Sequence, residues 1–413
     1  MRILEGRAAE NYVRKLEQRG QKLDALEPRV RRIVQSVRRD GDRALRRYAE
    51  RWDGLGAGDA LRVSEDEMQA ALKSSSRELR VALETAAGNI RNFCQWQKPR
   101  EWVREKQGRK LGQLVRPLSS VGCYVPGGRY PLPSTLLMTV IPAQVAGVKE
   151  IRVVSPRPAQ TTLAAAALLG VREFYRMGGA QAVAALAYGT KTVPRVNKIV
   201  GPGNLFVTTA KKIVAFDCAI DFLAGPTEGL VLCDDGEPSF IASDLVAQAE
   251  HDPEALVLLV TQSHKLARSV SHSVAALARG NTVAQQSLRK HGAVLLATSP
   301  AQAIAWTNRI APEHLTTTRE RLPGIVSAGS IFLGDYSAQA AGDYGSGPNH
   351  VLPTGGVARF RGGLSVSDFL KIMTVQEISR AGLRKIAPSI LTLAEAEGLG
   401  AHARSIELRC GHA

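Results

Sequence analysis

Residues 229–278 read GLVLCDDGEPSFIASDLVAQAEHDPEALVLLVTQSHKLARSVSHSVAALA. Short apolar runs at 229–233 and 255–261 are each followed by a segment whose apolar residues recur at helical spacing, 238–251 and 264–278. Short strands that alternate with helices are typical of βαβ units, in which a helix joins two parallel strands. This part of the chain therefore predicts an α/β module with a parallel sheet.

The same alternation occurs on both sides of these residues. Further strands are expected at 150–155, 171–177, 198–200, 293–297 and 331–333, and further helices at 161–169, 180–187, 205–214 and 301–310. Two doubly wound α/β modules are therefore expected in one chain, with an active site between them.

The two ends of the chain are expected to be mostly helical. Apolar residues recur at helical spacing through 30–52, 65–72 and 78–96. Ser64 and Glu67 have the spacing of a capping box, and no strand is expected before about Val115. The Gly- and Pro-rich segment 123–134 predicts a loop, and 366–397 predicts a return to helix before a short tail.

Length and composition indicate a globular protein. A chain of 413 residues, of which 44% are hydrophobic, can bury the cores of two or more domains. No run approaches the roughly 18–20 apolar residues of a membrane span, and the N-terminus has no apolar signal region. We expect a cytoplasmic protein without membrane association. Five cysteines without a CxxC pair favour reduced, buried thiols over a zinc finger or a disulfide framework.

The charge balance is basic, with 54 Lys+Arg against 38 Asp+Glu. The arginines are densest within 29–51, where apolar residues are interleaved with them at roughly helical spacing. The solvated face of an amphipathic helix accounts for this pattern. Aromatic residues make up only 5% of the chain, which is few for base-stacking platforms. We therefore expect no nucleic-acid partner.

Glycine-rich turns follow two expected strands of the first module, MGGAQ (177–181) and GPGN (201–204). Ligands of open α/β sheets bind at the carboxyl ends of strands, and the helix that follows such a strand offers backbone N–H groups to an anion. A dinucleotide pyrophosphate is one interpretation of these turns. Plain tight turns are the other, because the chain has no GxGxxG fingerprint after a strand.

Polar side chains suited to chemistry are denser in the second module. Gln248 and His251 lie three residues apart on one expected helix and so share a face. Such a pair can hold a metal, although a histidine near a helix end more often caps the helix or packs in the core. Glu313 and His314 are adjacent in a proline-bearing loop, an arrangement that suits acid/base chemistry.

Two further groups lie towards the C-terminus. The glycine-rich segment 342–350 carries Asp343 and His350, and Zn²⁺ accepts both Asp oxygen and His nitrogen. Turn chemistry alone does not explain that combination. Glu397 and His402 flank a Gly-Leu-Gly turn and by themselves indicate little.

Taken together, nine segments make the chain similar to histidinol dehydrogenases. They are RRDGDRALRRYAERWDG (38–54), VGCYVPGGRYPLPSTLLM (121–138), MGGAQAVAALAYGT (177–190), NKIVGPGN (197–204), DFLAGPTEGLVL (221–232), SDLVAQAEHD (243–252), NRIAPEHL (308–315), GDYGSGPNHVLPTGG (342–356) and EAEGLGAH (395–402). APEHL and SGPNHVLPT are highly specific in combination, and the resemblance spans nearly the whole chain.

The resemblance implies an intertwined homodimer. Each subunit is expected to have two Rossmann-like modules without a GxGxxG fingerprint, a helical N-terminal region and a C-terminal helical tail. The implied domains are an N-terminal extension (1–18), a larger α/β domain with most metal and catalytic residues (19–123 and 227–364), a smaller NAD-contacting domain (124–226) and a tail that reaches the partner subunit (365–413).

The resemblance also implies the residues of the site. Those that bind one Zn²⁺ per subunit are Gln248, His251, Asp343 and His402, the last supplied by the partner subunit. Those that act as the catalytic pair are Glu313 and His314. Those that contact substrate are Thr227, His350 and Glu397, together with the metal ligands and the catalytic pair. Those that contact NAD are Tyr124, Gln181 and Asn204.

The activity implied is a zinc-assisted, four-electron oxidation of L-histidinol through L-histidinal to L-histidine, the last steps of histidine biosynthesis, with two NAD per turnover. The zinc is expected to hold the amino and imidazole nitrogens of the substrate. His314 is expected to take the alcohol proton, and Glu313 to help activate water in the aldehyde step.

Two residues depart from the family pattern, and two alternatives remain. Thr227 stands where many relatives have Ser, and Cys94 where the family usually has His. One alternative is a related dehydrogenase acting on another small alcohol, against which the retention of His350 and Glu397 argues. The other is a non-enzymatic relative, against which the retained zinc ligands and His314 argue.

Overall fold

A computed structural model describes residues 1–20, 23–127 and 130–411, which fall into two compact units. Unit 1 comprises Met1–Gln97 and Ser119–Phe369, and unit 2 comprises Lys98–Leu118 and Leu370–Ala413. Unit 1 contains two six-stranded sheets, and unit 2 contains one sheet of three strands. Nearly all strand pairs in unit 1 are parallel, which confirms the expected α/β class.

The first sheet of unit 1 runs in the order β2-β7-β6-β5-β8-β9, with only β2 antiparallel to its neighbour. Counted from β5, the order is that of a doubly wound fold. The strands are β2 (Arg62–Val63), β5 (Ser120–Tyr124), β6 (Glu150–Val154), β7 (Glu173–Tyr175), β8 (Lys198–Val200) and β9 (Ala219–Ile220). The helices are α2 (Glu27–Asp40), α3 (Asp42–Tyr48), α4 (Glu65–Ser74), α5 (Arg77–Gln97), α6 (Pro133–Ala146), α7 (Gln160–Leu168), α8 (Gly179–Tyr188) and α9 (Leu205–Val214).

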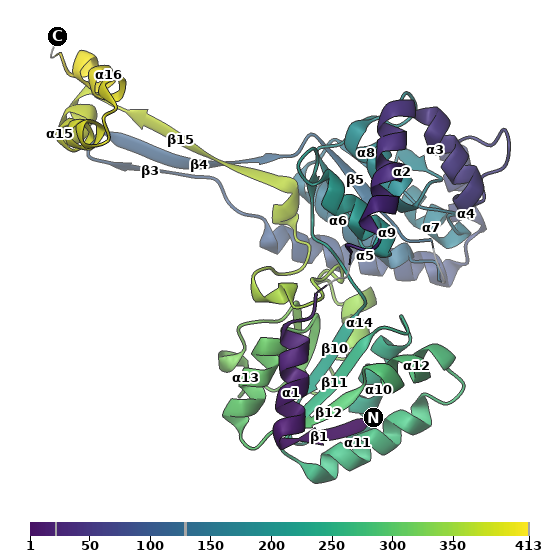
Figure 1. The fold of residues 1–413 in the computed structure, drawn as a ribbon. Coiled ribbons are helices and arrows are strands. Elements are labelled where there is room, and N and C mark those ends of the chain that lie inside the picture. The colour runs from purple at the N-terminus through teal and green to yellow at the C-terminus, as the bar shows by residue number, and fades with distance from the viewer. Residues whose placement is uncertain (21–22, 128–129, 412–413) are drawn as a thin grey trace. The chain divides into compact units, whose positions relative to one another are not determined.

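Helices α2, α3, α8 and α9 share one apolar cluster with the first sheet. Val30, Val37 and Leu45 from the N-terminal helices are buried in it beside Val183 and Val207. Helix α6 contacts β5 and β6 of this sheet and also packs against α5 and α7. The arginine-rich segment is thus amphipathic, as expected, and its apolar side packs against α8 and α9, in the same apolar cluster as this sheet (Figure 1).

The second sheet runs in the order β1-β12-β11-β10-β13-β14 and is parallel throughout. The strands are β1 (Arg2–Glu5), β10 (Glu228–Leu232), β11 (Leu256–Thr261), β12 (Ala293–Leu296), β13 (His314–Thr317) and β14 (Ser330–Leu333). The helices are α1 (Gly6–Glu17), α10 (Pro238–Ala249), α11 (His264–Leu277), α12 (Thr282–Lys290), α13 (Pro300–Ile310) and α14 (Gln339–Tyr344). One core cluster includes residues of α10, α11 and α12, and another includes residues of α1 and α13.

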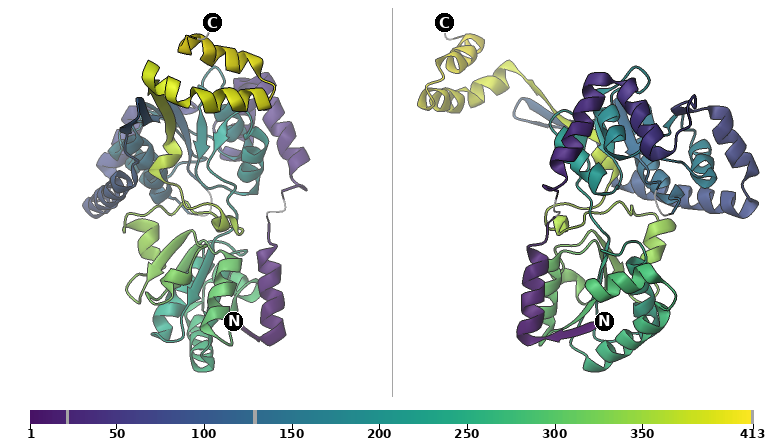
Figure 2. Two further views of the ribbon diagram at one scale, coloured as in Figure 1. Left: turned by 90° about the vertical axis from the view of Figure 1, so that its left-hand side faces the viewer. Right: turned by 45° about the vertical axis from the view of Figure 1, so that its right-hand side comes forward.

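Unit 2 consists of an antiparallel ribbon that carries two helices. Its strands are β3 (Trp102–Lys106), β4 (Arg109–Pro117) and β15 (Leu370–Ile378), in the order β15-β4-β3. Helices α15 (Arg380–Ala396) and α16 (Gly400–Cys410) lie against each other beyond one end of the ribbon (Figure 2). Most side chains of β3 and β15 are exposed, so the ribbon has little core of its own.

The N-terminal region is mostly helical, as expected, but the expectation that no strand precedes about Val115 was wrong. Strands β1, β2 and β3 all precede Val115, and β4 begins at Arg109. Strand β1 pairs with β12 and α1 packs against α13, so residues expected to form an extension belong to the second sheet. Helices α2 and α3, expected in the same domain as that sheet, pack instead on helices that flank the first sheet, α2 against α8 and α9 and α3 against α8. Short edge strands are held by distant partners and leave too little pattern in their own sequence.

The expectation of a continuous helix over 366–397 was also wrong. A short 3₁₀ turn at Val366–Phe369 is followed by β15, and α15 begins only after Ser379, whose side chain accepts from the N–H of Gly382. β-branched residues of β15 pair with β4 across the whole strand. The segment 123–134, expected to be a loop, begins within β5 and ends in the first turn of α6, and Gly128 and Arg129 lie outside the described residues.

Other expectations of the sequence are confirmed. Ser64 accepts a hydrogen bond from the N–H of Glu67 at the start of α4. All five cysteines are free and buried, and burial raises the pKa of Cys94 to about 11. No helix in the described ranges is long and apolar enough to span a membrane.

Candidate active site

Glu313 and His314 are buried side by side where α13 passes into β13. Ala311 ends the helix in a left-handed conformation (φ +50°), and Pro312 cannot extend it. The chain therefore turns sharply, and His314 becomes the first residue of β13, opposite Gly229 of β10. Glu313 is 6% and His314 3% exposed.

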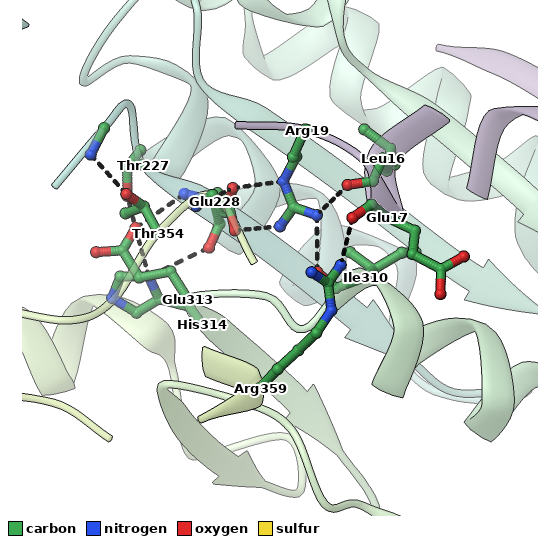
Figure 3. A network of polar contacts seen from close by, with 12 residues as sticks. Leu16, Glu17, Arg19, Thr227, Glu228, Ile310, Glu313, His314, Thr354 and Arg359 are labelled. Carbon is green, nitrogen blue, oxygen red and sulfur yellow. Dashed lines mark hydrogen bonds and ion pairs between the residues drawn. The ribbon is translucent and has the colours of Figure 1, made fainter. Parts of the chain in front are cut away.

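Protein donors hold the carboxylate of Glu313 in place. Its Oε2 accepts from the hydroxyl of Thr227 at 2.7 Å and from the backbone N–H of Glu228 at 2.9 Å (Figure 3). On the other side, Nδ1 of His314 lies 3.3 Å from the carbonyl oxygen of Glu228. Nε2 of His314 is buried, has no hydrogen-bond partner among the described residues, and lies 3.5 Å from Oδ1 of Asp343.

The two carboxylates control the charge of His314. Burial lowers the pKa of His314, but Glu313 and Asp343 more than offset this and raise it to about 10. Burial also raises the pKa of Asp343, yet the neighbouring His314, with His350 and His251, holds it below its usual value. The two neighbouring carboxylates therefore favour the protonated form of His314.

Gln248 and His350 lie around Asp343 of α14. Nε2 of Gln248 donates to Oδ2 of Asp343 at 3.4 Å, and the hydroxyl of Thr227 lies 3.1 Å from Oε1 of Gln248. His350 places Nδ1 2.7 Å from the carbonyl oxygen of Asp343 and Nε2 3.3 Å from the hydroxyl of Thr135. The expected helix ends at Ala249, so His251 lies two residues beyond α10 instead of sharing a helix face with Gln248, and it is exposed.

Seven of the residues expected at the site therefore gather in unit 1. They are Thr227, Gln248, His251, Glu313, His314, Asp343 and His350. Glu397 and His402, both exposed, belong to unit 2, where Glu397 follows α15 and His402 lies in α16.

The donor atoms around Asp343 suit a divalent metal. Within the described ranges, no three His, Cys, Asp or Glu side chains form a metal-binding group, and the expected set contains only two such side chains in unit 1, His251 and Asp343. Asp oxygen and His nitrogen are ordinary Zn²⁺ ligands, whereas the amide of Gln248 is an unusual one. A cation at Asp343 would offset one of the charges that raise the pKa of His314. The residues present therefore fit a zinc ion that takes a further ligand from elsewhere.

A separate cavity of about 360 Å³ brings together the three expected NAD contacts, Tyr124, Gln181 and Asn204. The cavity also contains a buried acid that no sequence motif predicted, Asp53. Its carboxylate accepts from the N–H of Gly178 at 2.9 Å and from Nε2 of Gln181 at 3.0 Å. The hydroxyl of Tyr124 accepts from the N–H of Gly179 at 3.0 Å.

Protein groups therefore already use two N–H groups at the start of α8. Asp53 and Tyr124 accept from the N–H groups that an anion could have used, and an anion site was one of the two interpretations of this turn. The structure therefore favours the other interpretation, a plain tight turn. Burial raises the pKa of Asp53 against the effect of its hydrogen bonds to Gly178 and Gln181. Asn204 caps α9 by accepting from two backbone N–H groups.

The turn at Gly201 is held by a buried ion pair. Gly201 has φ +111°, and a Cβ there would lie 2.2 Å from the carbonyl oxygen of Tyr124, so only glycine fits. Its N–H donates to Asp221 at 2.8 Å, and its carbonyl accepts from Nζ of Lys211 at 2.6 Å. Lys211 and Asp221, 2% and 1% exposed, are paired with each other. The pair fixes the backbone three residues before Asn204.

The candidate site residues lie at opposite ends of the strands in the two sheets. In the first sheet, Tyr124 and the two glycine-rich turns lie at the carboxyl ends of strands, as expected. In the second sheet, Glu228 and His314 are the first residues of β10 and β13, so the Glu313–His314 pair lies at the amino ends of the strands. The expectation of a site at the carboxyl ends of strands therefore holds for only one module.

The family model for histidinol dehydrogenase matches residues 16–410 of the chain. The chain belongs to the histidinol dehydrogenase family. A histidinol dehydrogenase from Methanothermobacter thermautotrophicus is 48% identical over 402 residues, which cover 94% of this chain and 93% of the relative. One from Geobacter sulfurreducens is 48% identical and covers 91% of each chain.

A solved structure agrees with this family membership. The crystal structure of histidinol dehydrogenase from Elizabethkingia anophelis superposes with a TM-score of 0.94 at 37% identity, covering 99% of this chain and 98% of the other. The expected resemblance to histidinol dehydrogenases is thus confirmed over nearly the full length.

Proposed function

We propose that this member of the histidinol dehydrogenase family oxidises L-histidinol through L-histidinal to L-histidine, with two NAD per turnover, as the last steps of histidine biosynthesis. The observation that carries the proposal is the buried Glu313–His314 pair beside Asp343 and Gln248, in a chain of this family. A cytoplasmic homodimer with shared active sites completes the proposal.

The proposed metal ligands are Gln248, His251 and Asp343 of one subunit with His402 of the partner subunit. Zn²⁺ bound there would hold the amino and imidazole nitrogens of the substrate and fix the carbinol carbon. Thr227, His350 and Glu397 are proposed to contact the substrate. Thr227 and His350 already hydrogen-bond within this set, so both are oriented before substrate binds.

His314 is proposed to take the alcohol proton on Nε2, the buried atom that has no partner in the described part of the chain. Because Nδ1 faces the carbonyl oxygen of Glu228, neutral His314 would carry its proton on Nδ1 and keep Nε2 free. NAD, contacted by Tyr124, Gln181 and Asn204, would accept the hydride of each step.

Glu313 is proposed to serve the second oxidation. Its carboxylate is fixed by Thr227 and by the N–H of Glu228, and Oε2 lies 3.6 Å from Nδ1 of His314. A carboxylate held in this way can accept a proton from the water that adds to the aldehyde. Burial of the pair keeps bulk water away from the aldehyde.

The test is NADH formation by the purified chain with L-histidinol, followed by absorbance and by chromatography of the amino-acid product. We expect two NADH per histidine, loss of activity on chelation and its return with Zn²⁺. His314→Asn, purified in parallel, controls for contaminating dehydrogenases. A zinc-loaded protein that forms no NADH from L-histidinol, or a metal-free one with full activity, would overturn the proposal.

A further inference from the structure

The backbone of one residue, Glu228, contacts both members of the proposed acid/base pair. Glu228 is the first residue of β10; its N–H donates to Glu313 at 2.9 Å, and its carbonyl oxygen lies 3.3 Å from Nδ1 of His314. The orientation of this single residue therefore sets where both side chains point. A rotation of the Glu228 backbone would move both groups together.

The side chain of Glu228 is itself held by an arginine from the N-terminal segment. Arg19 makes a two-pronged contact, with Nε 2.8 Å from Oε1 and Nη2 2.6 Å from Oε2. The N–H of Gly355 donates to the same Oε1 at 2.9 Å. Only a guanidinium offers this planar match to a carboxylate, which fixes the direction of the acid as well as its charge.

Arg19 also holds the chain just before the acid/base pair. Its Nη1 donates at 2.7 Å both to the carbonyl of Leu16, near the end of α1, and to the carbonyl of Ile310. Ile310 lies three residues before Glu313, at the end of α13. One side chain thus joins α1 and α13 to the start of β10, as Figure 3 shows.

A second layer of contacts fixes the surroundings of Arg19. Nη2 of Arg359 donates to the carbonyls of Glu17 and Arg309, one on each of the helices that Arg19 joins. The hydroxyl of Thr354 accepts from the N–H of Gly225 at 2.6 Å, shortly before Thr227. The segment around Gly355 is therefore tied both to the residues just before β10 and to Glu228 at its start.

We propose that the Arg19–Glu228 ion pair is a positioning clamp that aligns Glu313 and His314 for catalysis. The inference rests on the function proposed above for those two residues. Neither side chain of the clamp touches the reacting atoms. Both act through the backbone of Glu228, whose N–H and carbonyl oxygen contact Glu313 and His314. A buried ion pair is a poor device for stability alone, because apolar residues of similar volume often serve as well. What the Arg19–Glu228 pair adds is the fixed direction of the four hydrogen bonds that Arg19 donates, two to Glu228 and one each to Leu16 and Ile310.

Kinetics of two variants test the clamp. Arg19→Met should lower kcat on the order of 100-fold while KM for histidinol changes little, because a displacement of about 1 Å has an effect of that size. Arg19→Lys keeps the charge without the planar fork and should recover only part of kcat. Glu228→Gln provides a second route to the same loss should Arg19→Met be insoluble.

The matched control is Arg152→Met. Arg152 of β6 is 5% exposed and pairs with Glu173 in the first sheet, away from the Glu228 peptide. This variant loses a buried ion pair without affecting the clamp and should keep the wild-type kcat below its melting temperature. Equal kcat losses in Arg19→Met and Arg152→Met would mean that losing either ion pair only destabilises the fold, and they would overturn the proposal.

Hydrogen exchange of the metal-free protein gives a readout that needs no activity. In Arg19→Met, peptides covering 224–232 and 311–317 should exchange faster than in wild type, and in Arg152→Met they should not. Unchanged exchange there, or wild-type kcat in Arg19→Met, overturns the clamp. A wild-type protein that is inactive with L-histidinol overturns the proposed function instead, so the two failures are distinguishable.

Discussion

Lys211→Met probes the buried ion pair at the Gly201 turn, three residues before Asn204 of the cavity. The substitution removes the ammonium group that binds Asp221 and the carbonyl of Gly201, while the methionine fills nearly the same volume. Breaking a buried pair from one side costs about 3–5 kcal/mol of unfolding free energy, because the remaining charge stays buried. Asp221 keeps the N–H donors of Gly201 and Phe222, which places the expected cost near the lower figure, about 3 kcal/mol.

Calorimetry and kinetics measure the two consequences. At about 2 °C per kcal/mol for a domain of this size, the melting temperature should fall by about 6 °C. The GPGN turn also loses the contact at Gly201, three residues before Asn204. We therefore expect KM for NAD to rise several-fold while KM for histidinol stays near wild type.

Lys212→Met is the matched control. Lys212 is the next residue of α9, but its ammonium group is exposed and pairs with Asp24 and Glu27 at the surface, where ion pairs contribute little. The double variant Lys211→Met/Asp221→Asn should recover part of the lost stability, because it no longer buries a lone charge. A Lys211→Met protein as stable as Lys212→Met would refute the reasoning.

Three further predictions concern the acid/base pair, the shared site and acid stability. In single-turnover experiments Glu313→Gln should slow the oxidation of histidinal more than that of histidinol, and equal losses would mean that the role is wrongly assigned. Co-expressed His402→Ala and His314→Ala subunits should show about a quarter of wild-type activity, because half the dimers are hybrids with one intact site; confirmed but inactive hybrids would contradict a shared site. Burial raises the pKa of Asp368, but Lys198 and other donors hold it below its usual value. Asp368 therefore stabilises the folded protein above the unfolded pKa of about 3.9, and this stabilisation is lost as the pH falls through the folded pKa. Denaturant midpoints between pH 3 and 7 should therefore fall with acid less steeply in Asp368→Asn, and an unchanged slope would contradict this.

Strong periodicity made much of the α/β part predictable. The strand at Lys198–Val200 and the helix at Leu205–Val214 have the expected bounds, because a buried parallel strand and an amphipathic helix each leave a local pattern. Strand β13 left none, since His314–Thr317 is short and lies within a segment that reads as polar. Strand β15 is stabilised by pairing with β4, more than 250 residues earlier in the chain, which no local window detects.

The residues of the candidate site could likewise be predicted only in part. Side chains with distinctive chemistry, such as His314 and Asp343, could be named from short motifs together with the family resemblance. Arg19, Asp53 and Glu228 could not, because an arginine or acid in one sequence gives no sign that it is buried or paired. Their partners lie more than 100 residues away along the chain, so only the folded structure brings them together.

The negative charge of Asp53 bears on how tightly the cavity beside α8 would hold a dinucleotide. In many nucleotide-binding folds the start of such a helix attracts phosphate and slows release, whereas here Asp53 presents a negative charge to the same end of α8. A dinucleotide in this cavity gains less electrostatic binding energy and should have a short residence time. In the reaction proposed above, one NADH would have to give way to a new NAD while the aldehyde remains bound, so fast exchange of the cofactor would matter more than tight binding.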